Sequence, residues 1–115
     1  MRIHYRHLAG LGGLRHARPD SINAGWRNAS FRGYADYMQT QEFDDSLRRC
    51  IDLAKRERVV LMCAEAVPIA DALLARGIAV SEITSGVRAQ PHVLTPWARL
   101  KGTQVTYPAA IVKVH

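Results

Sequence analysis

A continuous apolar run, Val59–Ala64, follows a long amphipathic segment and precedes a helical pattern at Ile69–Arg76. A short apolar run that begins with β-branched residues is typical of a strand buried on both faces of a parallel sheet. Ile78–Ile83 also reads as a strand and follows Gly77, a residue type that commonly ends a helix. The order helix, strand, helix, strand predicts an α/β fold with a mainly parallel sheet and right-handed crossovers.

The amphipathic segment after Thr40 carries the clearest helical pattern in the chain. Four apolar side chains share one face of this helix: Phe43, Leu47, Ile51 and Ala54. Cys50 lies beside this face, and we expect it in the core. Thr40 is a favoured N-cap residue, and acidic residues in the first turn with basic residues later suit the helix dipole. A shorter helix is expected from an N-cap at Ser30 to Met38, after an irregular polar loop over residues 14–28.

Three further extended segments are expected. Residues 2–8 alternate loosely and predict a short strand that ends at the glycine-rich turn 10–13. Leu100 and Val105–Tyr107 predict a small hairpin around the turn 101–103. The apolar segment Ile111–Val114 predicts an additional edge strand.

Length and composition limit the class of protein. A chain of 115 residues predicts one domain, residues 1–115, and 48% hydrophobic with 23% charged residues is typical of globular proteins. No apolar run approaches the roughly 18 residues of a membrane helix, and the start of the chain lacks the apolar region of a secretory signal. Two cysteines make no disulfide framework. Together these features predict a cytoplasmic protein without a membrane partner.

The net charge of +6 is unevenly distributed, because residues 1–33 hold six arginines against Asp20 alone. Such a basic segment favours anionic partners, either a small molecule such as a nucleotide or a nucleic acid. Arginine in particular suits two-pronged contacts with phosphate or carboxylate. The alternative is that these arginines pair with the acidic segment 34–57 or remain solvated on the surface.

Five residues of this basic third are the candidate ligand-binding residues: Gly12, Gly13, Arg27, Arg32 and Tyr34. The glycine turn can bring backbone amides close to a phosphate, but it matches neither the dinucleotide fingerprint nor the Walker pattern. Arginines beside a tyrosine combine cations with an aromatic ring, as binding of nucleotides or single strands requires. The alternatives are a plain tight turn and a tyrosine that packs in the core.

Five blocks of sequence occur together and in order: Tyr5-Arg-His-Leu8 with Leu11-Gly-Gly13, Trp26 to Met38, Leu61-Met-Cys-Ala-Glu65, Ile69 to Gly77, and Pro91-His-Val-Leu-Thr-Pro96. In these blocks the chain resembles the uncharacterised "domain of unknown function 488" family over most of its length. The resemblance implies a Rossmann-like three-layer fold and no established activity.

Two departures from the family pattern bear on fold and function. Members usually begin with two further strands and a helix, so we expect an incomplete sheet and a homo-oligomer in which a second copy covers its open flank. Members also usually carry a Trp-Arg-Cys-His-Arg stretch where Pro68 here joins Ile69 directly. Either the gene has lost this loop or the sequence omits it.

The candidate catalytic residues are Cys63 and Glu65, at the carboxyl end of the predicted strand, where open parallel sheets bind ligands. Cys63 precedes a helix by a short turn, and a helix N-terminus favours the thiolate. Glu65 can act as an acid–base group. Without the family loop, Cys63 lacks an adjacent base, and the alternatives are a buried core thiol and a structural glutamate.

Two functional hypotheses remain. One is an enzyme-like domain that binds an anion (phosphate, nucleotide or nucleic acid) at the carboxyl end of strand 59–64. The other is a non-catalytic module for assembly or for charge-driven nucleic-acid binding. No zinc motif is present, so no metal site is predicted, and the sequence leaves the cofactor open.

Overall fold

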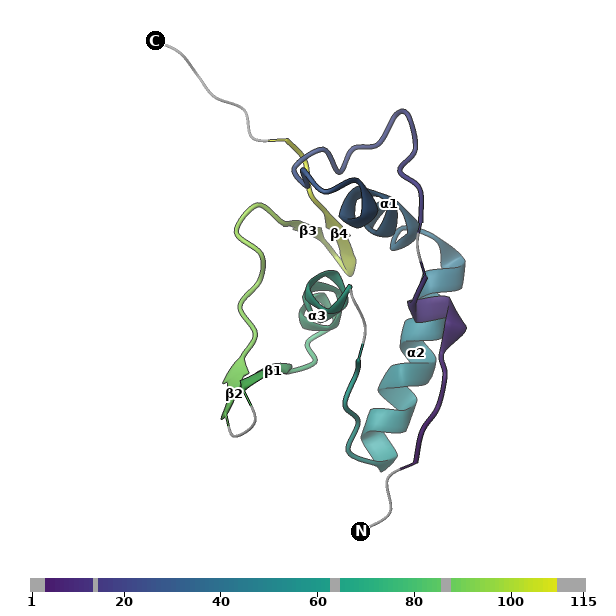
Figure 1. Cartoon of the computed structure of the whole chain (residues 1–115), viewed down its shortest axis with the longest axis vertical. Coiled ribbons are helices and arrows are strands. Elements are labelled where there is room, and N and C mark those ends of the chain that lie inside the picture. Colours follow the sequence, from purple (N-terminus) through teal and green to yellow (C-terminus); the bar gives the residue numbers. More distant parts are fainter. Residues whose placement is uncertain (1–3, 14, 63–64, 86–87, 110–115) are drawn as a thin grey trace.

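Three helices and two β-hairpins form the part of the chain that the computed structural model describes, residues 4–13, 15–62, 65–85 and 88–109 (Figure 1). The helices are α1 (Ala29–Tyr37), α2 (Gln41–Arg56) and α3 (Ala66–Ala75), and a short 3-10 helix at Ala9–Leu11 precedes them. One hairpin joins β1 (Ser81–Ser85) to β2 (Arg88–Pro91), and the other joins β3 (Arg99–Lys101) to β4 (Gln104–Thr106).

The predicted Rossmann-like three-layer fold with a mainly parallel sheet is wrong. Every strand in the described ranges pairs antiparallel with its neighbour in sequence, in two separate sheets. The segment 78–83 enters β1 only at Ser81, and β1 pairs with the strand that follows it. A hairpin closes a short loop at a small entropic cost, whereas a parallel pair needs a long crossover between its strands. The described fold is therefore a mixture of helices and local hairpins.

The apolar run 59–64 is not a buried strand where the structure describes it. Residues 59–62 form no strand, and Cys63 and Ala64 lie outside the described residues. Val60 is 69% exposed and Met62 is 93% exposed, while Leu61 packs against the core. A strand needs a hydrogen-bonded neighbour, and no described segment pairs with this one.

Helix α2 confirms the prediction for the segment after Thr40. The Thr40 hydroxyl oxygen accepts a hydrogen bond from the Phe43 amide at 3.3 Å, which caps the helix. Acidic residues occupy its first turn and basic residues its last, as the helix dipole favours. Phe43, Leu47 and Cys50 are buried, and burial raises the pKa of the Cys50 thiol. Cys50 is thus a core residue, as predicted.

Helix α1 begins two residues earlier than predicted. Asn28 rather than Ser30 is the N-cap, because its side-chain oxygen accepts from the amides of Ser30 and Phe31. The preceding loop contains no helix or strand among its described residues, which confirms the prediction for this segment.

Helix α3 begins at Ala66 rather than at Ile69. Pro68 lies in its first turn, where the missing amide proton costs no helical hydrogen bond. Gly77 follows the helix with a φ of 76°, the left-handed conformation predicted for a residue that ends a helix.

The smaller predicted elements have different outcomes. Strands β3 and β4 confirm the hairpin predicted between Leu100 and Val105. The short strand predicted over residues 2–8 is wrong for its described part, because residues 4–8 form no strand. The predicted edge strand Ile111–Val114 lies outside the described residues.

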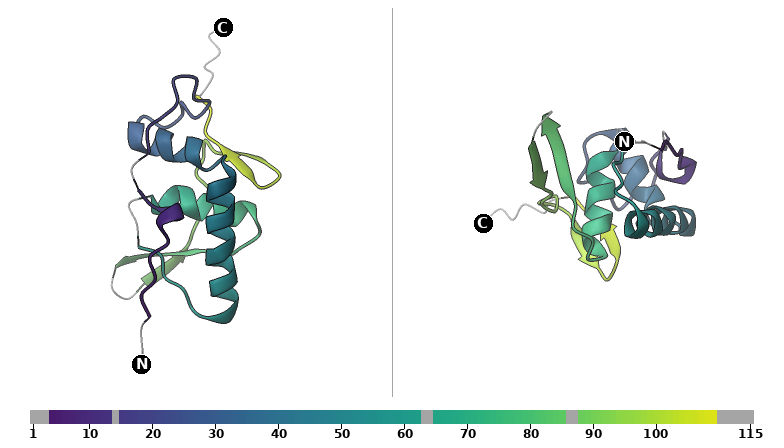
Figure 2. Two further views of the ribbon diagram at one scale, coloured as in Figure 1. Left: turned by 90° about the vertical axis from the view of Figure 1, so that its right-hand side faces the viewer. Right: turned by 90° about the horizontal axis from the view of Figure 1, so that it is seen from below.

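Aromatic side chains fill the core between the helices and the β3–β4 hairpin. Tyr34, Tyr37 and Phe43 meet edge to face, with ring centroids 5.9 to 6.1 Å apart. Trp26 packs against Tyr107 with a centroid distance of 5.1 Å. Figures 1 and 2 show α3 between α2 and the β1–β2 hairpin, so this hairpin lies on the outer side of α3. Within the described ranges, no helix combines the length and the apolar character of a membrane span.

Candidate functional site

A carboxylate on α1 holds the polar loop 15–23 in place. Asp36 accepts from the Ser21 hydroxyl at 2.6 Å, the Asn23 side-chain amide at 2.7 Å and the Arg18 backbone amide at 2.8 Å. Burial raises the pKa of Asp36, but these hydrogen bonds and the charge of Arg18 lower it by more, so the net shift is downward. The carboxylate therefore stays ionised at neutral pH and keeps the loop on α1.

The same loop touches the backbone of α1 at Gly33. A Cβ atom at this position would lie 2.0 Å from the Arg15 carbonyl oxygen and 2.9 Å from the Ala17 amide nitrogen. Both neighbours are backbone atoms, so no rotamer change could make room for a side chain. This contact accounts for a glycine in the middle of a helix, where glycine otherwise destabilises.

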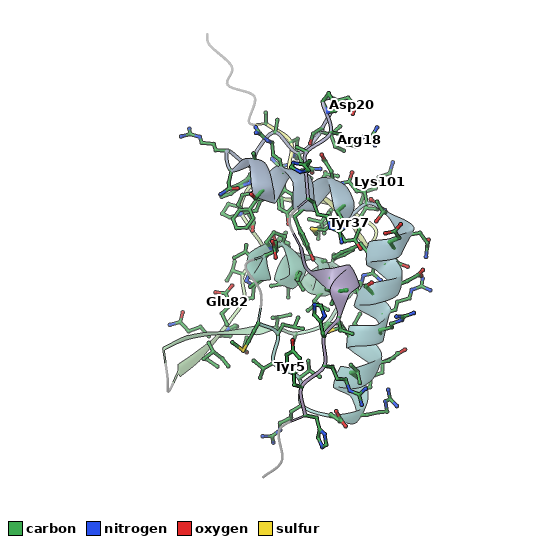
Figure 3. The ribbon with its side chains drawn as sticks, turned by 45° about the vertical axis from the view of Figure 1, so that its right-hand side comes forward. Tyr5, Arg18, Asp20, Tyr37, Glu82 and Lys101 are labelled. Carbon is green, nitrogen blue, oxygen red and sulfur yellow. The ribbon has the colours of Figure 1, made fainter. Side chains whose placement is uncertain are left out.

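A cleft of about 380 Å³ opens between this loop and the junction of α1 with α2. Most of the residues that line it have polar side chains, among them Arg15, His16, Arg18, Ser21, Gln39 and Thr40. We call it the Arg15 cleft. Figure 3 shows Arg18 and Asp20 at the outer end of the loop and Tyr37 nearer the body of the protein. The volume falls within the range of small-molecule sites.

Arg15 is the cation of this cleft that lacks a carboxylate partner. Its guanidinium carbon lies 3.7 Å from the centre of the Tyr37 ring, and one terminal nitrogen donates to the Gly12 carbonyl at 3.3 Å. Its Nε is buried and has no hydrogen-bond partner in the described part of the chain. No described carboxylate lies within ion-pair distance of this guanidinium.

The other charges around the cleft are already matched. Arg18 pairs with Asp20 at 3.1 Å on the surface, and the oxygens of Asp36 accept three hydrogen bonds from the loop. The formal charges of Arg15 and Arg18 equal those of Asp20 and Asp36, so the cleft has no net charge from these four residues. The guanidinium of Arg15 nevertheless keeps unused hydrogen-bond donors. The cleft is thus suited to one oxyanion and not to a chain of phosphates.

The hydroxyl groups of the cleft serve the fold. Ser21 donates to Asp36, and Thr40 donates to the Tyr37 carbonyl at 2.7 Å. Neither hydroxyl has an imidazole partner among the described residues, and a hydroxyl without such a base is a weak nucleophile. The same ranges contain no cluster of three side chains able to hold a metal ion. The described cleft offers contacts for binding.

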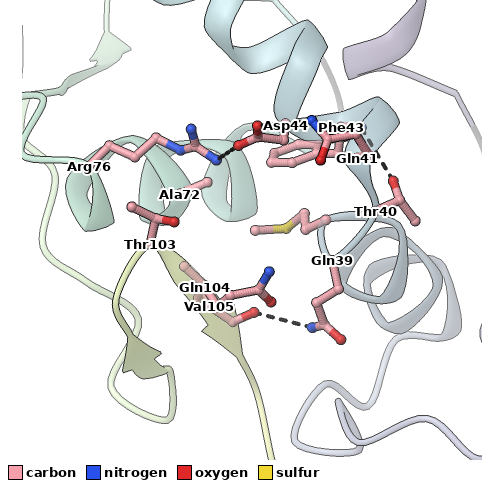
Figure 4. A pocket seen from close by; sticks show the side chains of 11 residues that line it. Gln39, Thr40, Gln41, Phe43, Asp44, Ala72, Arg76, Thr103, Gln104 and Val105 are labelled. Atoms are coloured by element: carbon pink, nitrogen blue, oxygen red, sulfur yellow. Dashed lines mark hydrogen bonds and ion pairs between the residues drawn. The ribbon is translucent and has the colours of Figure 1, made fainter.

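A second cavity of about 110 Å³ shares two lining residues with the Arg15 cleft (Figure 4). At its edge, Arg76 after α3 forms an ion pair with Asp44 on α2, and Asp44 also pairs with Arg48 at 3.1 Å. The hydrogen bond from Arg76 lowers the pKa of Asp44 against the smaller effect of burial. Because Asp44 neutralises Arg76, we expect this cavity to hold water.

The predicted catalytic pair cannot be placed as a pair. Cys63 lies outside the described residues, and Glu65 is the half-buried residue that precedes α3. Its side chain makes no capping hydrogen bond, and it lines neither the Arg15 cleft nor the second cavity. The catalytic roles of both residues stay predictions.

None of the five predicted ligand-binding residues lines the Arg15 cleft: Gly12, Gly13, Arg27, Arg32 and Tyr34. Tyr34 is fully buried and its hydroxyl donates to the Leu11 carbonyl at 2.5 Å, so its ring belongs to the core. Gly12 uses its carbonyl to accept from Arg15, and Gly13 has a φ of 96° that only glycine adopts readily. Arg27 is exposed ahead of α1, and Arg32 is half-buried on that helix. Their binding roles also stay predictions.

The cleft residues that sequence reasoning missed lie between the predicted ones. Arg15, His16 and Arg18 belong to the basic third of the chain, and its excess of arginine was the available signal. Nothing local indicated which arginine would lack a carboxylate, because that depends on Asp20 and Asp36 after folding.

The described residues form a small arrangement of helices and hairpins with a polar cleft in its N-terminal half. The family model "Domain of unknown function DUF488" matches residues 1–71, which include every residue named above in the Arg15 cleft. The match covers more than half of the chain, and the chain belongs to this family. No curated protein and no solved structure matches it.

Proposed function

We propose that this domain binds a small ligand with a single carboxylate or phosphate group in the Arg15 cleft. The observation that carries the proposal is the half-buried Arg15 guanidinium, which stacks on Tyr37 and has no carboxylate partner in the described ranges. A partly desolvated guanidinium with free donors gains more from an oxyanion than a solvated one does.

The same charges disfavour the alternative of a nucleic-acid-binding module. Polyanion binding requires several free cations along one surface, whereas beside the Arg15 cleft Arg18 is paired with Asp20 and, at the second cavity, Arg76 is paired with Asp44. A metabolite-sized anion suits the cytoplasmic setting that the composition favours. Assembly with a second copy of the chain stays a prediction.

The test is an NMR titration of the protein with inorganic phosphate and, separately, with acetate. Shifts in the amides of residues 15–18, 20–21 and 37–40 are expected on binding. Arg15→Met keeps the aliphatic stem and removes the charge, and we expect affinity to fall about tenfold or more, which equals one lost charged hydrogen bond. Arg49→Met is the matched control, because Arg49 is exposed on α2. We expect the Arg49→Met variant to bind phosphate and acetate with the affinity of the wild type.

Equal affinity of Arg15→Met and wild type would refute the site, as would the absence of shifts in the cleft at saturating phosphate. A short single-stranded oligonucleotide serves as the third probe. Binding of this probe that falls steeply with salt and depends equally on Arg15 and Arg49 would favour a polyanion surface over a small-ligand site.

A further inference from the structure

A buried imidazole joins the β1–β2 hairpin to α3. His92 follows β2, and its Nε2 lies 2.8 Å from a carboxylate oxygen of Asp71 on α3. Its Nδ1 is hydrogen-bonded to the carboxylate of Glu82 on β1. The His92 side chain is 4% exposed, so both ring nitrogens depend on these two carboxylates.

The two carboxylates are held very differently. Asp71 is fully buried and also accepts from the Thr95 amide at 3.0 Å and the Tyr107 hydroxyl at 2.7 Å. Glu82 has a side chain that is 43% exposed, and its described hydrogen bond is the one to His92. Asp71 therefore keeps two hydrogen-bond donors when the imidazole changes its protonation state, whereas Glu82 can replace its hydrogen bond to His92 by one to water.

The charge of the imidazole decides how many of these bonds exist. An imidazolium donates from both nitrogens, to Asp71 and to Glu82 at once, whereas a neutral imidazole donates from only one. The polar groups that face the ring are Asp71 from α3, Glu82 from β1, and behind Asp71 the Tyr107 hydroxyl after β4. No other described charged group lies within ion-pair distance of His92.

We propose that His92 is a pH-controlled latch: as an imidazolium it holds β1 to α3 through Glu82 and Asp71, and on losing its proton it releases Glu82 and loosens the hairpin. The hairpin lies on the outer side of α3, and its described residues Ser81, Ile83, Ala89 and Gln90 are exposed (Figure 2). The described side chains of the hairpin bury little apolar surface, so the polar link carries much of its attachment.

The direction of the pH effect follows from the surroundings of the ring. Burial lowers the pKa of His92, but the hydrogen bonds and charges of Asp71 and Glu82 raise it by more, to above the ordinary 6.5. Because the pKa of His92 is higher in the folded than in the unfolded state, the latch contributes its full stabilisation of the fold when the pH is below the unfolded-state pKa. This stability is lost as the pH rises through the higher folded value.

The test combines an NMR titration of the His92 ring with hydrogen exchange of the β1–β2 amides. In the wild type we expect a His92 titration midpoint above the ordinary histidine value of 6.5 and hairpin protection that falls across this midpoint. Glu82→Gln removes the charge and keeps the shape, and we expect it to lower the His92 midpoint by about one unit, a tenfold change in proton affinity. Glu42→Gln, an exposed change on α2, is the matched control and is expected to leave both readouts unchanged.

Two outcomes would overturn the latch. One is a His92 midpoint that is the same in Glu82→Gln and wild type. The other is hairpin protection that stays constant through the titration while His92 changes its charge. Since Glu82 is partly exposed, the variant is expected to fold, and unchanged protection of the α2 amides checks this.

Discussion

Replacing Gly33 by alanine sets two effects of opposite sign against each other in one residue. In the interior of a helix, alanine is more favourable than glycine by about 0.8–1.0 kcal/mol, so helix propensity alone predicts a more stable protein. In this structure the new methyl group would lie 2.0 Å from the Arg15 carbonyl oxygen, 2.6 Å from its carbonyl carbon and 2.9 Å from the Ala17 nitrogen. Real Cβ atoms essentially never approach other atoms closer than 3.0 Å, so the loop must move away by about 1 Å.

The steric effect is expected to exceed the propensity effect. Overpacking costs about 1–3 kcal/mol, and here it acts on backbone that Asp36 anchors through three hydrogen bonds. Subtracting the propensity gain leaves a net destabilisation of up to about 2 kcal/mol. The displaced loop also carries Arg15, so phosphate affinity should fall in the same variant.

Urea unfolding followed by circular dichroism measures this difference, with an unchanged m-value as the check that two-state unfolding holds. Gly12→Ala is the matched control: Gly12 has an extended φ of −118°, and no atom lies within 4 Å of the added methyl group. We expect that variant to be unchanged or up to about 1 kcal/mol more stable, because alanine restricts the unfolded chain. A Gly33→Ala protein that gains stability would refute the close contact between loop and helix.

Two further substitutions test the buried polar network and the helix cap. Asp71→Ala leaves His92 and two buried donors unpaired, and we expect the free energy of unfolding, measured in urea, to fall by about 3–5 kcal/mol. The control Asp45→Ala changes an exposed residue and is expected to lower it by less than about 0.5 kcal/mol. A decrease below about 1 kcal/mol for Asp71→Ala would show that Asp71 is not the centre of the network. Thr40→Ala removes the N-cap of α2 and should cost about 1 kcal/mol with a loss of helical circular dichroism, whereas Thr40→Asp, which keeps an acceptor, should retain most of the stability.

The elements that could be predicted from sequence are those decided within a few residues. The α2 helix follows from its apolar spacing and from Thr40, whose hydroxyl caps an amide three positions later. The end of α3 follows from Gly77, and the β3–β4 hairpin from a turn in which Gly102 has a φ of 62°. Asn28 and Ser30 are both good capping residues two positions apart, so the start of α1 was ambiguous by that interval.

The parallel sheet could not be predicted correctly, because composition does not say which segment a strand will pair with. Residues 59–62 have the apolar character of a buried strand, yet Val60 and Met62 are largely exposed. Residues 81–85 have a nearer partner in 88–91, and this local pairing leaves 59–62 without one among the described segments.

The polar sites depend on contacts that are distant in sequence. Asp36 bonds residues 13 to 18 positions before it, and Asp71 bonds residues 21 to 36 positions after it. Each aspartate sits in a helix on the buried side, where a sequence reader expects an apolar residue. Charge counting therefore indicated a basic segment but not the cleft within it, nor the histidine between two carboxylates.

One residue belongs to both polar regions. The Tyr107 amide donates to Asn23, which in turn donates to Asp36 beneath the Arg15 cleft, while the Tyr107 hydroxyl donates to Asp71 beside the latch. Burial and the charge of Asp71 raise the pKa of Tyr107 far above its ordinary value, so this hydroxyl keeps its proton at neutral pH. Tyr107 thus links the two regions as a permanent donor at any pH near neutrality. It follows that pH acts on the hairpin through His92, while the loop of the Arg15 cleft remains anchored across the same range.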